Sequence, residues 1–133
     1  MRILLDSNVW LAILTTDGQC RRLWRQVRGH SQIHASTDIL DEIEEKLWRK
    51  FGFSRRHAHL LTHFVRRQTL PVQINHPPAA VCRDADDDLI LAAAVNAGCS
   101  HLITGDNDLL VLKQVVGVTI ATPREFADLL AAS

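Results

Sequence analysis

The stretch RDADDDLILAAAVNAGCSHLITGDNDLL, residues 83–110, decides the fold class. It contains an acidic start, an apolar helical run near 87–97, a β-type run at 101–105 and two further aspartates. A helix that leads directly into a strand is one unit of an alternating α/β chain. In open parallel sheets, ligands bind outside the carboxyl ends of the strands. We therefore expect an α/β fold whose acidic residues lie at that edge.

The same alternation runs through the whole chain. The last helix has a clear start, because Thr122 can cap it, Pro123 suits its first turn and Glu125 can close a capping box. Alternation of this kind predicts a three-layer α/β/α domain over 1–133, with a mostly parallel twisted sheet of about five strands. The β-type runs lie at 2–6, 32–36, 70–75, 101–105 and 118–122, and the helical candidates lie near 8–14, 19–29, 37–51, 54–68, 87–97, 107–115 and 123–132.

The composition is that of an ordinary globular domain, with 133 residues, 47% hydrophobic and 23% charged. No apolar run approaches the ~20 residues that span a bilayer, so we expect no membrane association. Asp6 and Asn8 interrupt the apolar start and no small-residue cleavage site follows, which argues against a signal peptide. Cys20, Cys82 and Cys99 form no C-x-x-C pair, so we expect reduced thiols in a cytoplasmic protein.

Charge is unevenly distributed although the formal net charge is zero. Residues 21–67 hold eleven Lys/Arg against five Asp/Glu, whereas residues 68–133 hold three against eight. A solvated helix face is the simplest explanation of a charge run. The asymmetry nevertheless suggests a polyanionic partner such as nucleic acid.

Two aspartates follow β-type runs directly, Asp6 after the first and Asp106 after the fourth. A carboxylate in this position is costly unless it is hydrated, caps a helix or meets a cation. Helix capping explains one such residue, but the arrangement occurs twice. Gly105 allows the backbone to turn sharply before Asp106.

A third candidate is Glu42, which borders the apolar stripe of the helix near 37–51 and could reach a cleft. Ordinary surface pairing competes with this interpretation. Glu42 precedes Lys46 by four residues and Glu45 precedes Arg49 by four, as in helical ion pairs.

The acidic cluster of residues 84–88 is not a calcium loop. Its alternate aspartates fit the first, third and fifth positions of such a loop, but Leu89 stands at the required glycine and Val95 at the required glutamate. The helix dipole favours one or two acids in a first turn, and four exceed that need. Asp87 and Asp88 both precede apolar rows of the following helix, so periodicity does not choose between them.

Carboxylates from separate strands and helices form an oxygen-rich site that suits Mg²⁺ or Mn²⁺. Such a site serves metal-assisted hydrolysis of a phosphodiester, and the basic half of the chain would hold the polyanion. An aspartyl phosphatase also has an acid after its first strand, but its chemistry usually requires a second aspartate two residues later, where this chain has Asn8. A phospho-acceptor domain would need a lysine after a late strand, and Lys113 is badly placed.

Four blocks in order resemble the PIN-domain family, a small nuclease fold that includes many VapC-like toxin subunits of bacterial toxin–antitoxin pairs. The blocks are LLDSNVWLAIL, STDILDEIEEKL, RDADDDLILAAAVNAGCSHLITGDNDLL and the tail TPREF. The family's third acid lies eleven residues before the glycine of NAG, and counting back from Gly98 gives Asp87. Ala85 replaces the family's usual proline.

The resemblance implies a Mg²⁺- or Mn²⁺-dependent endoribonuclease with an RNA substrate, an antitoxin partner and a homodimeric state. RNA maturation or decay, and an inactive PIN binding module, are the alternatives. Trp10, Trp24 and Trp48 are expected in the core or an interface rather than under a base. The implied metal-binding acids are Asp6, Glu42, Asp87 and Asp106, with support from Asn8, Asp84, Thr104 and Asp108. The candidates for RNA backbone contact are Arg21, Arg22, Arg25, Arg49, Arg55, Arg56, Arg66 and Arg67.

Overall fold

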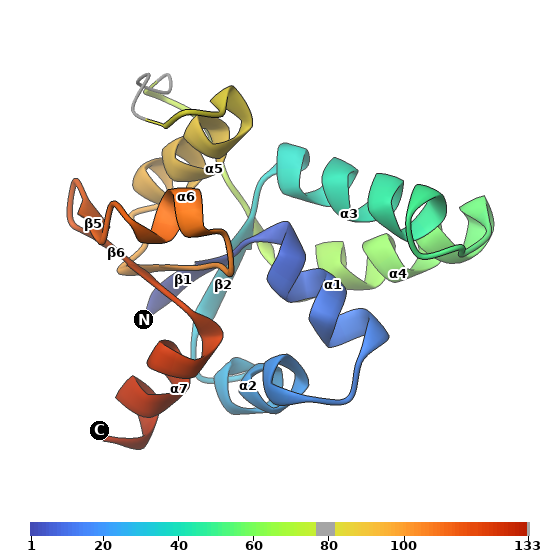
Figure 1. Cartoon of the computed structure of the whole chain (residues 1–133), viewed down its shortest axis with the longest axis horizontal. Coiled ribbons are helices and arrows are strands. Elements are labelled where there is room, and N and C mark those ends of the chain that lie inside the picture. Colours follow the sequence, from blue (N-terminus) through green and yellow to red (C-terminus); the bar gives the residue numbers. More distant parts are fainter. Residues whose placement is uncertain (77–81, 133) are drawn as a thin grey trace.

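The computed structural model describes residues 1–76 and 82–132, and within these ranges six strands form one sheet. The strand order is β3-β2-β1-β4-β6-β5, and every neighbouring pair is parallel except β5 with β6. The order reverses between β1 and β4, which lie side by side at the centre (Figure 1). The strands are β1 (Arg2–Leu5), β2 (Gln32–Ala35), β3 (Leu70–Pro71), β4 (His101–Ile103), β5 (Gln114–Val115) and β6 (Val118–Ala121).

The helices connect these strands and cover the sheet. In Figure 1, α1, α3 and α4 lie to the right of the sheet and α5 lies to its upper left. The predicted α/β fold with a mostly parallel sheet is confirmed. The described helices are α1 (Ser7–Thr15), α2 (Gln19–Val27), α3 (Thr37–Arg49), α4 (Arg55–Gln68), α5 (Ala85–Asn96), α6 (Asn107–Leu110) and α7 (Pro123–Ala131).

The core lies where the central strands meet the helices. Ile3, Leu4 and Leu5 of β1 have no exposed surface, as expected for a parallel strand with helices on both faces. The alanines of α5 let that helix approach the sheet closely, and Ala93 and Ala94 are fully buried. Within the part of the chain that the structure describes, no helix has the length and apolar character to cross a membrane.

Two predicted elements differ from the structure. The helix expected over 107–115 ends at Leu110, because Gln114 and Val115 pair with β6 as the antiparallel strand β5. Gly117 makes the connecting turn with φ of +81°, a conformation that costs glycine little. The strand expected over 70–75 is limited to Leu70–Pro71.

Candidate metal centre

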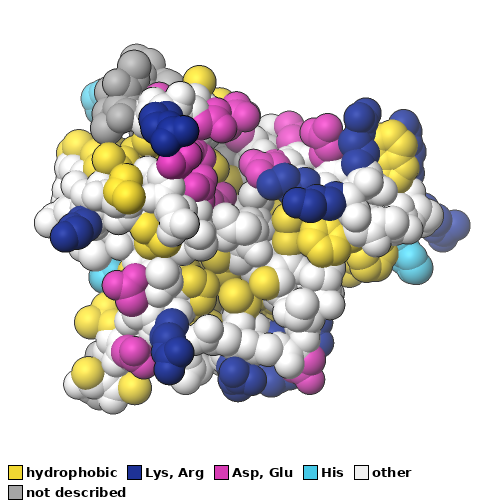
Figure 2. All heavy atoms as spheres, viewed as in Figure 1, with side chains coloured by type: hydrophobic (Ala, Val, Ile, Leu, Met, Phe, Trp, Pro, Cys, Tyr) yellow, Lys and Arg dark blue, Asp and Glu magenta, His cyan; other side chains and the backbone are white. Residues whose placement is uncertain are grey.

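A cleft of about 660 Å³ opens at the edge of the sheet where β1 and β4 end. Its walls come from the starts of α1 and α5, from α3 and from the turn after β4. Figure 2 shows Asp and Glu side chains gathered over this edge, between α5 and α3. The four carboxylates expected to bind metal all line this cleft: Asp6, Glu42, Asp87 and Asp106.

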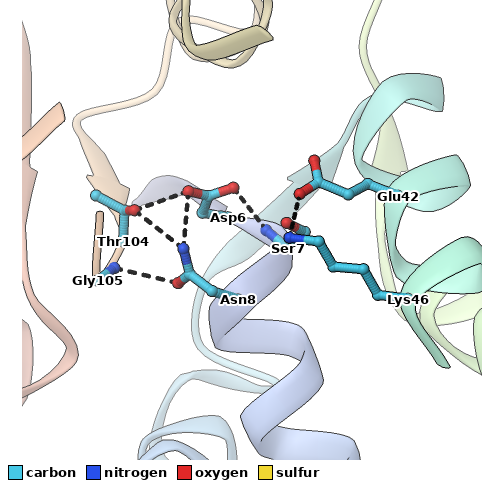
Figure 3. Close-up of polar contacts among 7 residues, drawn as sticks. All are labelled: Asp6, Ser7, Asn8, Glu42, Lys46, Thr104 and Gly105. Atoms are coloured by element: carbon cyan, nitrogen blue, oxygen red, sulfur yellow. Dashed lines mark hydrogen bonds and ion pairs between the residues drawn. The ribbon is translucent and has the colours of Figure 1, made fainter. Parts of the chain in front are cut away.

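Asp6 is the buried centre of a hydrogen-bond network that joins β1 to β4 (Figure 3). Its side chain is 2% exposed and caps α1 by accepting a hydrogen bond of 2.7 Å from the Ser7 N–H. Its second oxygen accepts hydrogen bonds from the Thr104 hydroxyl at 2.7 Å and the Asn8 amide at 3.1 Å. These donors fix the orientation of the carboxylate before any cation binds.

The pKa of Asp6 is raised, chiefly because burial removes water from the charged form. The hydrogen bonds from Thr104 and Ser7 act in the opposite direction, whereas the nearby charges of Glu42 and Asp106 raise the pKa further. The network therefore stabilises the ionised carboxylate in a place where its surroundings disfavour it.

The turn after β4 places Asp106 beside this network. Its N–H donates to the Thr104 hydroxyl at 3.0 Å, and the preceding Gly105 N–H donates to the Asn8 side-chain oxygen at 3.1 Å. The Asp106 carboxylate accepts the Asp108 N–H at 3.0 Å and so caps the short helix α6. Thr104 is fully buried, and its hydroxyl links two acids of the cleft. The hydroxyl donates a hydrogen bond to the Asp6 carboxylate and accepts one from the Asp106 N–H.

Asp87 enters the cleft from the first turn of α5, and its side chain is 6% exposed. Burial raises its pKa to about 7, and the neighbouring Asp106 adds both charge repulsion and a hydrogen bond to the protonated form. The charges of Asp84 and Asp6 raise it further. A carboxyl group held this close to other acids is ionised readily only when a cation offsets the repulsion.

The other aspartates of the cluster have different contacts. Asp84 caps α5 by accepting the Asp86 N–H at 2.9 Å, while Asp86 is exposed at the rim of the cleft. Asp88 is 8% exposed and accepts the Cys82 N–H at 2.8 Å, so it anchors the segment that enters α5. This anchoring contact of Asp88 was not predicted from the sequence.

Glu42 faces the other acids from α3 and pairs with Lys46 one turn later, at 2.8 Å (Figure 3). The predicted pairing of Glu45 with Arg49 is present as well, at 3.6 Å. Lys46 also lines the cleft. Its place within the acidic site was missed, because the sequence spacing indicated only a surface ion pair.

Three carboxylates approach closely enough to share one ion. One oxygen each from Asp87, Asp106 and Asp108 lies within 4.8 Å of the others. Hard oxygen donors at such spacing fit Mg²⁺ or Mn²⁺. Asp108 was expected only in a supporting role, yet it stands among the three closest acids, whereas Asp6 and Glu42 complete the cleft wall.

The arginines expected to contact RNA are dispersed. Only Arg49 lines the acidic cleft. Arg21 donates to the backbone carbonyl groups of Ile13 and Leu14, which end α1, and Arg25 pairs with Asp17 at 3.7 Å. Figure 1 shows α2, which carries Arg21, Arg22 and Arg25, at the opposite end of the molecule from α5.

None of the four arginines of α4 lines the acidic cleft. Arg55, at the start of α4, packs over Trp48, with its guanidinium carbon 4.0 Å from the ring centroid. Arg56 follows in the first turn, while Arg66 and Arg67 are in the last turn of the same helix.

The three cysteines, all within the described ranges, are free thiols. Burial raises the pKa of Cys82 to about 12, helped by the hydrogen bond and charge of Asp88 and by the charges of Asp87 and Asp106. Burial likewise raises the pKa of Cys99 to about 11. Protonated thiols are poor nucleophiles, so the chemistry of this cleft lies with its carboxylates.

The family model described as PIN domain matches residues 2–108, so this chain belongs to the PIN-domain family. The matched range includes Asp6, Glu42, Asp87 and Asp106, the four acids expected to bind metal, and Asp108. A comparison with curated protein sequences finds no match.

Solved structures share the fold at low sequence identity. The VapBC2 structure from Rickettsia felis, bound to a DNA fragment from its promoter, has a TM-score of 0.67 and 11% identity over 90% of this chain and 97% of that one. VapBC-1 from nontypeable Haemophilus influenzae has a TM-score of 0.64 and 11% identity over 93% of this chain and 99% of that one. Mycobacterium tuberculosis VapC20, described as a sarcin-ricin loop cleaving toxin, has a TM-score of 0.59 and 17% identity over 85% of this chain and 96% of that one.

Proposed function

We propose that this protein is a metal-dependent endoribonuclease that hydrolyses RNA phosphodiester bonds with Mg²⁺ or Mn²⁺. One observation carries the proposal: carboxylates from four separate parts of the chain converge on one cleft at the reversal point of the sheet. Burial, and in addition the charges of neighbouring acids, raise the pKa values of Asp6 and Asp87. A divalent cation relieves the repulsion among these acids.

In this proposal Asp6, Glu42, Asp87 and Asp106 hold the cation, and Asp108 adds a fifth carboxylate. The cation, when bound, activates water and stabilises the leaving oxygen. Thr104 and Asn8 hold the Asp6 carboxylate in one orientation through hydrogen bonds of 2.7 and 3.1 Å. The attacking group is water, and no side chain needs to form a covalent bond with the substrate.

The proposal extends to the toxin component of a toxin–antitoxin pair, working in the cytoplasm with an antitoxin partner and as a homodimer. Its support is the likeness to VapBC structures and to VapC20. That likeness is one of fold, and the same fold serves other roles. RNA maturation or decay by the same chemistry is therefore the alternative.

Cleavage of a labelled RNA pool tests the chemistry. We expect wild type to cut in Mg²⁺ or Mn²⁺ and to stop in EDTA. Asp87→Asn removes one ligand charge and should lower the rate at least about a hundredfold. Equal cleavage by both proteins, cleavage that survives EDTA, or a preference for DNA over RNA would each contradict the proposal.

Asp88→Asn is the matched control, because it changes the neighbouring aspartate of the same turn. The amide oxygen that this substitution introduces can still accept the Cys82 N–H, so most activity should remain. The toxin assignment has its own test. Induction should arrest growth of a bacterial host, and a small co-purifying partner should relieve the arrest. Neutral expression with full nuclease activity would favour RNA maturation or decay.

A further inference from the structure

A basic–aromatic segment, residues 46–56 with sequence KLWRKFGFSRR, borders the acidic cleft. It contains five Lys or Arg residues, three aromatic residues and no acid. The segment covers the end of α3, the following turn and the start of α4. Interleaved basic and aromatic side chains are the usual composition of surfaces that bind single-stranded nucleic acid.

Trp48 is the organising residue of this segment. Two guanidinium groups contact its ring, with the Arg49 carbon 4.8 Å and the Arg55 carbon 4.0 Å from the centroid. Trp48 is half-buried, whereas Trp10 and Trp24 are 0% and 6% exposed and belong to the core. The tryptophans were expected in the core or an interface: Trp10 and Trp24 lie in the core, while Trp48 is partly buried and packs against the core.

The hollow beside Trp48 adjoins the acidic cleft, because the two share lining residues. It has a volume of about 410 Å³ and includes Trp48 and Arg55 in its wall. Asp41, Glu45 and Arg49 line both this hollow and the acidic cleft. In Figure 2, Lys and Arg side chains lie around hydrophobic ones over the outer end of α3, next to the acidic group at the sheet edge. A chain leaving the cleft along α3 would therefore meet Trp48 next.

Two of the three acids that line the hollow, Glu44 and Glu45, contact basic partners. Glu45 pairs with Arg49 at 3.6 Å, and Glu44 lies 3.3 Å from the His59 ring nitrogen. Both contacts are exposed and therefore weak enough to exchange. Arg55 is held over Trp48 by a cation–π contact rather than in a bidentate pair, so its outer donors can reach a phosphate.

We propose that the basic–aromatic segment binds the single-stranded RNA adjoining the bond to be cut. One base stacks against Trp48, and the phosphates pass Arg49, Lys50 and Arg55. This inference rests on the proposed nuclease function. Of the dispersed arginines it assigns only Arg49 and Arg55 to substrate binding, and we call Trp48, Arg49, Lys50 and Arg55 the substrate track. It also assigns to Trp48 a positioning role outside the metal centre.

Tryptophan fluorescence gives a direct readout, because the other two tryptophans are buried. A single-stranded RNA of about 12 nucleotides is titrated into the full-length protein in Ca²⁺, with a gel to verify that the RNA stays intact. We expect the RNA to quench wild-type emission, and Trp48→Phe to lose that quenching. Trp48→Ala should weaken binding about tenfold, as loss of one stacked base does.

Salt dependence tests the arginines separately. For single strands, each lost phosphate contact lowers the slope of log K against log salt by about 0.7. We expect that reduction for Arg55→Ala and about twice it for the double variant with Arg49→Ala. Arg124→Ala is the matched control, since this exposed arginine is in α7, outside both hollows, and its slope should equal that of wild type.

The outcomes separate the two proposals. Quenching that survives Trp48→Phe, or salt slopes equal to wild type in both arginine variants, would overturn the substrate track even if wild type cleaves RNA. A protein that never cleaves RNA but shows Trp48-dependent quenching would contradict the nuclease and leave the RNA-binding surface standing. Trp48→Phe retains an aromatic ring, so its thermal unfolding should match wild type and exclude misfolding.

Discussion

Single residues of the cleft link its charge to protein stability. Without metal, Asp87 has a pKa of about 7 in the folded chain and an ordinary value near 3.8 when unfolded. Between these values the folded state holds the extra proton, so stability falls as pH rises, by at most about 1.4 kcal/mol per pH unit. Unfolding by urea in EDTA, from about pH 5 to about pH 8, should show this decline in wild type.

Asp87→Asn should flatten that curve, because the amide does not titrate. The curve should keep a smaller slope, since the pKa of Asp6 is raised as well. Asp88→Asn serves as the comparison, being one residue away. If wild type and Asp87→Asn gave parallel curves, Asp87 would not be the group that titrates.

Thr104→Val tests the hydrogen-bond network at nearly constant volume. The substitution removes the donor to the buried Asp6 carboxylate and the acceptor for the part-buried Asp106 N–H. We expect a loss of about 1–3 kcal/mol in the free energy of unfolding and weaker Mn²⁺ binding. Thr104→Ser keeps the hydroxyl and should retain most of both, as calorimetric titration and urea unfolding would reveal. Equal behaviour of these two variants would contradict a role for the hydroxyl.

Lys46→Met should strengthen metal binding. The Lys46 ammonium lies 2.8 Å from Glu42 and competes with a cation for that carboxylate. Exposed pairs of this kind contribute about 0.2–1 kcal/mol, so the dissociation constant for Mn²⁺ should fall up to about fivefold. Lys50→Met removes an equal charge from the rim of the same cleft and controls for net charge. An equal gain in both variants would point to general electrostatics instead.

The sequence alone indicated four acids that line the cleft, Asp6, Glu42, Asp87 and Asp106, but not the contacts that position them. Helical period left Asp87 and Asp88 equivalent, because both precede apolar rows; the spacing of the PIN-domain family selected Asp87. In the structure, Asp87 lines the cleft while Asp88 accepts the Cys82 N–H. That difference depends on the path of the chain before α5, which no periodicity describes.

Elements were predictable where their signals are local. The capping box of α7 is present as expected, with Glu125 accepting the Thr122 N–H and donating its own N–H to the Thr122 hydroxyl, both at 3.0 Å. The strand β5 was missed, because two residues of edge pairing leave no alternation to read. The sequence also did not decide whether Glu42 of α3 faces the cleft. Amphipathicity shows which face of a helix is buried, but not which element that face packs against.

Helix α5 sets the position of Asp87, so packing beneath it should affect the cleft. Ala93 is fully buried, and Ala93→Leu should cost about 1–3 kcal/mol in the free energy of unfolding because the helix must move away from the sheet. The displaced helix should also bind Mn²⁺ more weakly. Ala132→Leu, on an exposed residue after α7, should be neutral in both thermal unfolding and metal titration. Unchanged metal affinity in a destabilised Ala93→Leu variant would uncouple α5 packing from the site.

In the folded molecule, residues from the acidic half and the basic half of the sequence meet at one cleft. The acidic half supplies Asp87, Asp106 and Asp108, and the basic half supplies Glu42 and the basic–aromatic segment. The alternation of strands and helices predicted the α/β class and the functional edge. The strand order could not be inferred in the same way, because it depends on which long-range pairings have the lowest free energy.

The network between Asp6 and Thr104 joins residues 98 positions apart in the chain. Translation delivers Asp6 first and Thr104 98 positions later. While β4 is still inside the ribosome, the nascent chain lacks the donor that orients Asp6 and the acids at positions 106 and 108. The cleft is complete only after both segments have been made, so the proposed nuclease would stay inactive on the nascent chain, beside the messenger RNA and ribosomal RNA.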